Sequence, residues 1–342
     1  MSGIYVHGIG AISPAGWGME ALRWALEAGT PLPTKTLARP GWDKPLTVRR
    51  VLPPGKRLEF LSHARLRRAS PISYFVVGAA LEAVGGDASL IANGTLRAGI
   101  VSCVMNGCVN YSRRFYDEVL REPTIASPLV FPETVFNAPA SHLAALLGTP
   151  AINYTVVGDP GGFLQGLAVA AQWLAEGRVD ACVVVGAEET DWLTSEANHI
   201  FSRRSALSEG AGAVYLKGNR GPGALAELRS VTDAHLFLRS QDRAKAAELA
   251  RAQLPPCTAD QLLADSRQGL TRQDAAETAA WSDWTAARIS PKIILGEGLT
   301  AGAAWQCAVA VDAFQRKRYA AASVSVVGCN QQAIGAHFVG LN

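Results

Sequence analysis

The sequence has no closely spaced pair of cysteines and no cluster of histidines. Its six histidines are isolated from one another, and its six cysteines lie mostly within apolar runs such as ACVVVG. The cysteines are Cys103, Cys108, Cys182, Cys257, Cys307 and Cys329. Zinc sites need ligands at tight paired spacing, which is absent here. We therefore expect buried free thiols and no metal ion.

Long apolar runs and a strong charge imbalance are also absent. No window contains the roughly 18 uninterrupted apolar residues of a membrane span. No basic segment followed by an apolar run opens the chain, as a signal peptide would require. The net charge of +3 over 342 residues is too small to indicate nucleic acid binding. We expect a cytoplasmic protein with no membrane span and no nucleic acid partner.

What the sequence does contain is enough apolar residues for a large core, with 49% hydrophobic and 18% charged residues. Apolar runs alternate with alanine-rich helical patterns. Apolar runs that do not alternate with polar residues are typical of strands covered on both faces, so they predict a layered α/β fold. These predicted strands include residues 4–11, 98–107, 180–189, 211–218, 291–298 and 322–329. The more polar segment 236–283 is predicted to be helical.

An internal repeat supports this prediction. Residues 163–187 and 303–329 share an alanine-rich helix leading to an apolar strand that ends in glycine. Similar units in both halves predict a duplicated fold. The join falls near residues 218–223, where three glycines and a proline interrupt the pattern. We therefore divide the chain into an N-terminal half, residues 1–220, and a C-terminal half, residues 221–342.

Residues 49–68 are strongly basic, with seven arginines and lysines against the single acid Glu59. Two interpretations remain open. This stretch forms either a solvated face with partners inside the chain or a docking surface for an acidic partner. The docking candidates are Arg49, Arg50, Arg65, Arg67 and Arg68.

The segment VVGDPGG, residues 156–162, joins a predicted strand to a predicted helix. Such an elbow can present a nucleophile or bind a phosphate. It lacks the Lys-Ser/Thr ending of a P-loop, and Pro160 removes a backbone N–H donor. Asp159 precedes this proline and is predicted to form an Asx turn, although a role as nucleophile or base stays open.

A nucleotide cofactor is not expected at the first predicted strand either. Gly8 and Gly10 are followed by Ser13 where a dinucleotide-binding motif needs a third glycine. We expect no cofactor.

Several ordered stretches resemble the β-ketoacyl synthases of the thiolase superfamily, the condensing enzymes of fatty acid and polyketide synthesis. The matching stretches are residues 5–29, 65–83, 130–148, 153–189 and 208–216. The resemblance covers nearly the whole chain. It implies an α/β, thiolase-like layered αβαβα fold built from two duplicated halves.

The catalytic residues of that family are missing from this sequence. The family nucleophile lies seven positions after the asparagine of its elbow and twenty before the aspartate of G-x-x-D. Counts from Asn153 and from Asp180 both lead to Pro160. Ser266 occupies the position of the first histidine, and Glu297 follows Lys-x-x-x-Gly at the position of the second. Without a thiolate and two histidines, condensation has no acyl carrier and no oxyanion stabilisation.

The resemblance therefore implies a non-condensing subunit similar to a chain length factor. Its partners would be an active β-ketoacyl synthase, in a heterodimer, and an acyl carrier protein, in a type II polyketide or fatty acid system. Candidates for the acyl tunnel or the interface are Tyr111, Phe115, Tyr116 and Phe136, and the alternative that these aromatic side chains simply fill the core stays open. The alternative is a thiolase-fold acyltransferase or hydrolase that uses Asp159, Ser266 or Glu297, or a homodimer that binds an acyl carrier.

Overall fold

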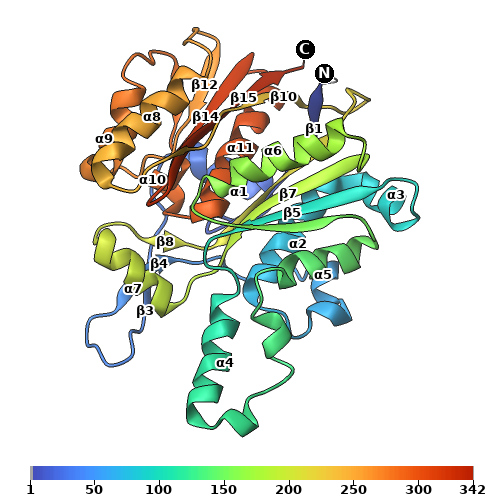
Figure 1. Ribbon diagram of the computed structural model, residues 1–342, viewed down its shortest axis with the longest axis vertical. Helices are drawn as coiled ribbons and strands as arrows, with labels where there is room; N and C mark the ends of the chain where they lie inside the picture. The colour runs from blue at the N-terminus through green and yellow to red at the C-terminus, as the bar shows by residue number, and fades with distance from the viewer. Residues whose placement is uncertain (1–2, 342) are drawn as a thin grey trace.

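The computed structural model describes residues 3–341 as a mixed α/β molecule whose main sheet has two similar halves (Figure 1). The first half has the strand order β6-β5-β7-β9-β1, and the second has the order β13-β12-β14-β15-β10. Antiparallel pairing of β1 with β10 joins the two halves.

The strand bounds follow the apolar runs closely. In the first half they are β1 Ile4–Ser13, β5 Ala98–Val104, β6 Asn153–Val157, β7 Ala181–Glu188 and β9 Gly210–Lys217. In the second half they are β10 Ala226–Val231, β12 Gln261–Ala264, β13 Ala287–Ile289, β14 Ala321–Val327 and β15 Gln332–Gly340. Short strands are β2 Gly16–Trp17, β3 Lys35–Leu37, β4 Leu46–Arg49, β8 Leu207–Ser208 and β11 His235–Leu236.

Helices form three layers around these strands. Their bounds are α1 Met19–Ala28, α2 Pro71–Val84, α3 Ala88–Ala92, α4 Val109–Arg121, α5 Ala138–Leu147, α6 Gly162–Ala175, α7 Trp192–Phe201, α8 Arg243–Ala252, α9 Thr271–Ala280, α10 Pro291–Leu295 and α11 Leu299–Gln315. The central layer is α6 and α11, which contact each other and strands of both halves. Every residue of α11 up to Phe314 is buried. A helix that is apolar all round, like this one, belongs in the interior.

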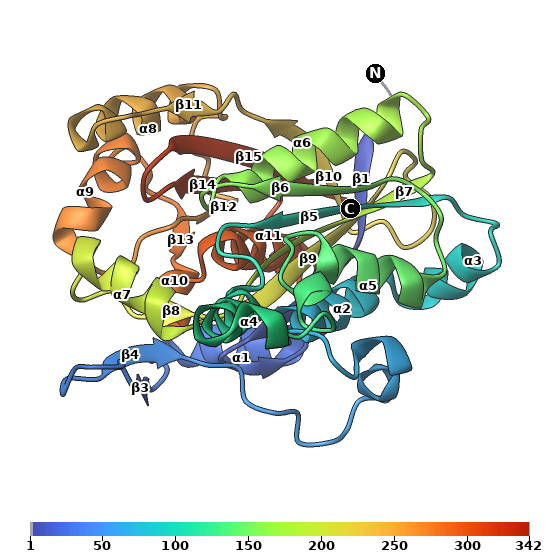
Figure 2. The same cartoon turned by 60° about the horizontal axis from the view of Figure 1, so that its bottom comes forward.

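The outer layers cover the other face of each half. Helices α2 and α5 pack on the first half, and α8 and α9 pack on the second. Figure 2 shows these two pairs on opposite sides of the molecule. The predicted layered αβαβα arrangement is therefore confirmed.

Glycines in β1 explain how closely α2 approaches the sheet. A Cβ at Gly8 would lie 1.8 Å from the carbonyl oxygen of Ala83, and one at Gly10 would lie 2.0 Å from that of Ala79. These glycines serve helix–strand packing, and α2 leaves no room there for a nucleotide-binding loop. Residues 71–92, which contain α2, are long and apolar enough to cross a membrane but are half buried in this core.

The repeat has a structural counterpart in the pairing of the strands. In the first half β7 pairs parallel with β5 and antiparallel with β9, and in the second β14 pairs parallel with β12 and antiparallel with β15. The helix–strand units α6–β7 and α11–β14 are the two copies predicted from the sequence. The loop of residues 218–225 lies between β9 and β10, close to the predicted join.

Two predicted elements differ from the structure. Residues 291–298 were expected to form a strand, but the short helix α10 begins at Pro291. A short apolar run cannot be assigned to strand or buried helix by its pattern alone, and proline favours the first turn of a helix. The segment 236–283 contains α8 and α9 as predicted, but it also contains the buried strand β12, which is only four residues long.

Candidate functional site

The elbow between β6 and α6 is built around the buried carboxylate of Asp159. Its Oδ1 accepts a hydrogen bond from the Gly161 backbone N–H at 3.1 Å, which confirms the predicted Asx turn. The same carboxylate accepts the backbone N–H groups of Gln331 and Gln332, each at 3.2 Å, and the Gln332 side-chain amide at 2.9 Å. Asp159 therefore ties the elbow to the turn between β14 and β15.

These contacts also define what Asp159 can do chemically. Burial raises the pKa of its carboxyl group, and the four hydrogen bonds oppose that effect. Because those bonds occupy both oxygens, the carboxylate has a structural task in the elbow.

Gly328, in the facing turn, has no space for a side chain. A Cβ at this position would lie 1.9 Å from Asp159 Oδ2. The glycine that ends the repeat thus allows the two turns to meet.

Ser266, which the sequence count predicts at the position of the first histidine, has a hydroxyl group that both donates and accepts a hydrogen bond. Its hydroxyl donates to Glu277 Oε2 at 2.7 Å and accepts the backbone N–H of Val327 at 3.1 Å. Glu277 is buried and also accepts the Ser325 hydroxyl. Burial, together with the charge of Asp265, raises the pKa of Glu277 to about 7.

Stability should therefore depend on pH through Glu277. Its raised pKa means that the fold favours the protonated carboxyl group. The contribution of this group to the unfolding free energy is therefore full below the ordinary glutamate pKa of about 4.3 and is lost as pH rises toward 7. We expect the unfolding free energy of the wild type to fall over this interval relative to that of Glu277→Gln. Urea denaturation at several pH values measures the difference. The exposed Glu248→Gln is the control, and parallel profiles for wild type and Glu277→Gln would contradict the prediction.

Glu297, which the sequence count predicts at the position of the second histidine, forms a buried ion pair. Lys292 Nζ lies 2.8 Å from its Oε1, and both side chains are almost fully buried. Oε1 also accepts the Leu299 backbone N–H at 2.8 Å, and Oε2 accepts the Gln268 side-chain amide at 2.7 Å. Gln268 in turn accepts the Ser205 hydroxyl at 2.6 Å. A polar network thus occupies this part of the site.

The turn of residues 327–332 brings the three positions together. Ser266 bonds to Val327 at its start, and Asp159, next to Pro160, bonds to Gln332 at its end. Between them, the charges of Glu297 and Asp159 help to raise the pKa of Cys329. Ser266 and the elbow beside Pro160 therefore both bond to this one turn.

Cys329 corrects the prediction that the cysteines are buried. Cys103, Cys108, Cys182 and Cys307 are buried, but Cys257 is half-buried and Cys329 is exposed. Cys329 differs because it lies in the turn after β14 and not in the strand. Burial of its sulfur and the nearby carboxylates raise the pKa of Cys329 to about 12. The thiol is therefore protonated at neutral pH and a weak nucleophile.

The tunnel candidates lie on and beside α4, which projects from the bottom of the molecule in Figure 1. Tyr111 and Phe115 are half-buried, and the ring of Phe115 packs on Phe131 at 5.4 Å between centroids. Tyr116 is 61% exposed. The aromatic ring of Phe136 covers Gly107. Tyr116 is therefore more exposed than Tyr111 and Phe115 on the same helix.

The five arginines of the basic stretch fall into two groups. Arg49 Nε donates to the carbonyl oxygen of Leu32 at 2.7 Å, and Arg50 Nη2 donates to that of Thr190 at 3.5 Å. Arg65, Arg67 and Arg68 line a cavity and have no side-chain hydrogen bond or ion pair within residues 3–341. Arg49 and Arg50 thus have partners inside the chain, whereas docking by the other three arginines stays a prediction.

Several apolar side chains are exposed on α4, beside it and on the edge strand of the first half. β6 is the last strand of the first half, and Tyr154 and Val157 on it are exposed. The end of α4 and the segment after it add further exposed apolar side chains. These are Leu120, Ile125, Leu129, Phe131, Val135 and Phe136.

Sequence reasoning missed Gln268, Gln331 and Gln332. Gln331 and Gln332 are 172 and 173 residues away from Asp159 along the chain. Gln268 reaches Glu297 across 29 residues. Glutamine carries no local signal for such a contact, so only the folded chain identifies these partners.

No family model matches the chain, and no curated protein matches it. Solved structures do match it in fold. The ishigamide ketosynthase/chain length factor has 19% sequence identity and a TM-score of 0.82, over 99% of this chain and 100% of that one.

Two further solved structures match over 100% of both chains. One is a type II polyketide synthase acyl carrier protein in complex with its ketosynthase, with 16% identity and a TM-score of 0.81. The other is a β-ketoacyl synthase from Burkholderia phymatum STM815, with 15% identity and a TM-score of 0.81. The likeness thus extends over the whole fold.

Proposed function

We propose that this chain, which has the thiolase-like fold of ketosynthases, is a non-condensing subunit that pairs with an active β-ketoacyl synthase. One observation carries the proposal. Counting along the sequence assigns Pro160, Ser266 and Glu297 to the positions of the family's nucleophile and histidines, and Ser266 and Asp159, the neighbour of Pro160, both bond to the turn that follows β14. None of them can carry an acyl group as a thioester or stabilise an oxyanion as an imidazole does.

The alternative of a different reaction has less support. Asp159 is bound to backbone N–H groups, Ser266 is bound to Glu277 and Val327, and Glu297 is paired with Lys292. A general base or nucleophile needs a free lone pair that faces the substrate. We therefore do not propose an acyltransferase or hydrolase.

The surface around β6 and α4 supports pairing with another chain. Monomeric proteins rarely leave an apolar patch of more than a few hundred Å² in water. A free sheet edge with exposed Tyr154 and Val157 is also a template for pairing with another strand. The ketosynthase/chain length factor among the matching structures suggests an active ketosynthase as the occupant.

In this arrangement α4 would line the partner's acyl tunnel at the end of the growing chain. The basic residues Arg65, Arg67 and Arg68 would help to dock an acidic acyl carrier protein. The subunit would act in a cytoplasmic type II polyketide or fatty acid system without a cofactor of its own.

The pairing is tested by co-expression with a candidate ketosynthase that has an intact Cys-His-His triad. Native mass spectrometry should show one copy of each chain. As a matched pair, Val157→Lys on the free edge should abolish the complex, whereas Lys245→Met on the exposed face of α8 should not. A homodimer that forms in place of the complex with the ketosynthase would refute the proposal.

The tunnel role predicts changes in product length. Phe115→Ala or Tyr116→Ala should lengthen the partner's product while leaving its first acylation intact, because these side chains would meet only the end of the chain. Mass spectrometry of the products measures this. Trp24→Ala, an exposed aromatic on α1, is the control. Unchanged lengths in both variants, with the complex assembled, would remove these residues from the tunnel.

A further inference from the structure

We infer that the buried carboxylates of Glu188 and Glu189 form a pH-dependent anchor for α4, which holds this helix to the body of the protein more firmly in mild acid than in mild alkali. Glu188 ends β7, and Glu189 follows it directly. Their side chains bind the loop that leads into α4 and the first turn of the helix. The inference concerns this chain alone and goes beyond the proposed function.

Helix α4 is attached to the body mainly at its first turn. Val109, at its start, is the one buried residue of the helix. Its main contacts with other elements are with the 3₁₀ turns Pro123–Ile125 and Phe131–Glu133, which follow it in the chain, and it projects from the layers of the fold (Figure 1). Because so little of α4 packs in the core, its position depends on polar contacts at its start.

Glu188 fixes the loop before α4. Its carboxylate accepts the backbone N–H of Met105 at 2.6 Å and that of Asn106 at 3.0 Å. Its Oε1 also accepts the Thr300 hydroxyl of α11 at 2.7 Å. The next loop residue, Gly107, has a φ of 61°, in the left-handed region that favours glycine. A carboxylate from the core therefore holds the backbone on which α4 would turn.

Glu189 fixes the first turn of α4 beside the start of α2. Its Oε1 accepts the Asn110 backbone N–H at 2.8 Å, and its Oε2 accepts that of Ile72 at 3.0 Å. The Ser70 hydroxyl donates to Oε2 at 2.7 Å. The same carboxylate thus joins α4 to α2, and α2 belongs to the core.

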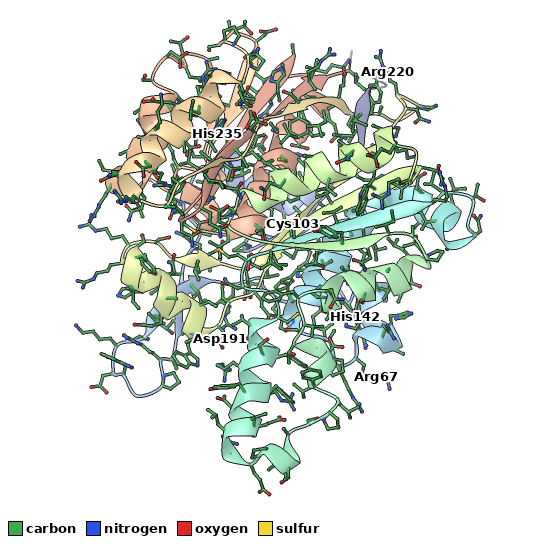
Figure 3. All side chains as sticks on the ribbon, in the orientation of Figure 1. Arg67, Cys103, His142, Asp191, Arg220 and His235 are labelled. Carbon is green, nitrogen blue, oxygen red and sulfur yellow. The ribbon has the colours of Figure 1, made fainter. Side chains whose placement is uncertain are left out.

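No cation neutralises the two carboxylates, because neither forms an ion pair among the described residues. The charged side chains on neighbouring segments are Arg50, Arg113, Asp191 and Glu209. Each of these is bonded to another group, and Asp191 pairs with Arg113 of α4 at 2.7 Å (Figure 3). The Cys108 thiol is the titratable group of the loop. Burial and the charge of Glu189 raise its pKa, so it stays protonated near neutral pH.

Burial determines the sign of the pH dependence. It raises the pKa of Glu188 to about 7 and also raises the pKa of Glu189, although the hydrogen bonds oppose this effect. Release of α4 would expose both groups to water, where the ordinary glutamate pKa is about 4.3. The anchored state therefore binds more protons. The contribution of the two groups to anchoring is full below about pH 4.3 and is lost as pH rises toward 7.

Hydrogen exchange of the purified full chain, with mass spectrometry of peptides from residues 105–121, tests the anchor. Labelling times are scaled for the pH dependence of intrinsic amide exchange. Between about pH 5.5 and about pH 8, protection of these amides should fall by about tenfold or more, as the two pKa values of Glu188 imply. An isolated helix of 13 residues is marginal in water, so a released α4 would exchange along its length.

Peptides from the buried helix α11 report unfolding of the whole protein. At each pH, residues 105–121 should exchange faster than these peptides, because release of α4 is local. Protection of residues 105–121 that stays constant between the two pH values would overturn the inference. Protection equal to that of α11 would overturn it as well.

A matched pair of variants assigns the effect to the anchor. Glu188→Gln has nearly the same shape but cannot ionise, so the change in protection should shrink to about threefold or less. Glu277→Gln is the control. Glu277 is also buried with a pKa raised to about 7, but it bonds to Ser266 and Ser325 in the second half. An equal reduction in both variants would mean that the whole fold responds to pH, and would overturn the inference.

Thr300→Val keeps the test decisive if Glu188→Gln fails to fold. It removes a hydrogen bond to the ionised carboxylate and leaves the carboxyl group in place. The midpoint of the pH profile should therefore move to higher pH. A midpoint that is unchanged or lower would contradict the role of Glu188. These measurements use no ketosynthase, so the anchor and the proposed pairing fail separately.

Discussion

Replacement of Lys292 by methionine is expected to destabilise the protein by about 3–5 kcal/mol, the usual cost of removing one partner of a buried ion pair. Lys292 and Glu297 are each less than 5% exposed, and Nζ lies 2.8 Å from Oε1. Without the ammonium group, the Glu297 carboxylate would stay buried with only the Gln268 amide and the Leu299 N–H as donors. The loss comes mainly from this uncompensated charge.

The double variant Lys292→Met/Glu297→Gln should recover much of that stability, because it leaves no buried charge. Chemical denaturation of the wild type, both single variants and the double variant gives the coupling free energy. Lys245→Met is the control, because Lys245 pairs with Glu248 on the surface and such pairs contribute about 0–1 kcal/mol. Losses that simply add in the double variant would show that the two side chains do not act as a pair.

A cysteine placed at position 160 is expected not to restore condensation. The thiol would stand at the start of α6, but Ser266 and Glu297 would still occupy the positions of the two histidines. Serine is already bonded to Glu277, and glutamate carries the wrong charge to stabilise an oxyanion or an enolate. Loss of a single oxyanion donor typically costs roughly 100- to 1,000-fold in rate.

The assay is condensation by Pro160→Cys with an acyl thioester and an extender unit, together with intact-mass analysis of acylation. The wild type should show no acyl adduct, because the sulfur of Cys329 is buried although the residue as a whole is exposed, and its pKa is raised to about 12. Cys329→Ser in the Pro160→Cys background shows whether any adduct belongs to the new cysteine. Measurable condensation by Pro160→Cys alone would overturn the roles assigned to Ser266 and Glu297.

The count that leads to Pro160 uses the elbow and the strand after it, which are local structures, and the absence of a condensing nucleophile there stays a prediction. The Asx turn at Asp159 was predictable for the same reason, since Gly161 is only two residues away. The cavity beside Arg67 was not, because His142 reaches it from a helix 75 residues later and no pattern links the two.

By itself, the sequence determined the layered fold and its internal repeat, whereas the loss of the condensing residues stays a prediction from counting along the chain. Apolar runs must be covered on both faces whatever their neighbours are, and helix–strand spacing is a property of adjacent residues. Only the tertiary structure decided which polar groups meet. In the folded chain Gln332 bonds to Asp159, and Cys329 is exposed. Arg49 and Arg50 bond to backbone carbonyls. Arg65, Arg67 and Arg68 have no side-chain partner among the described residues. The physical reason is that these hydrogen bonds and exposures depend on segments far apart in the chain, whose approach is set by packing of the whole core.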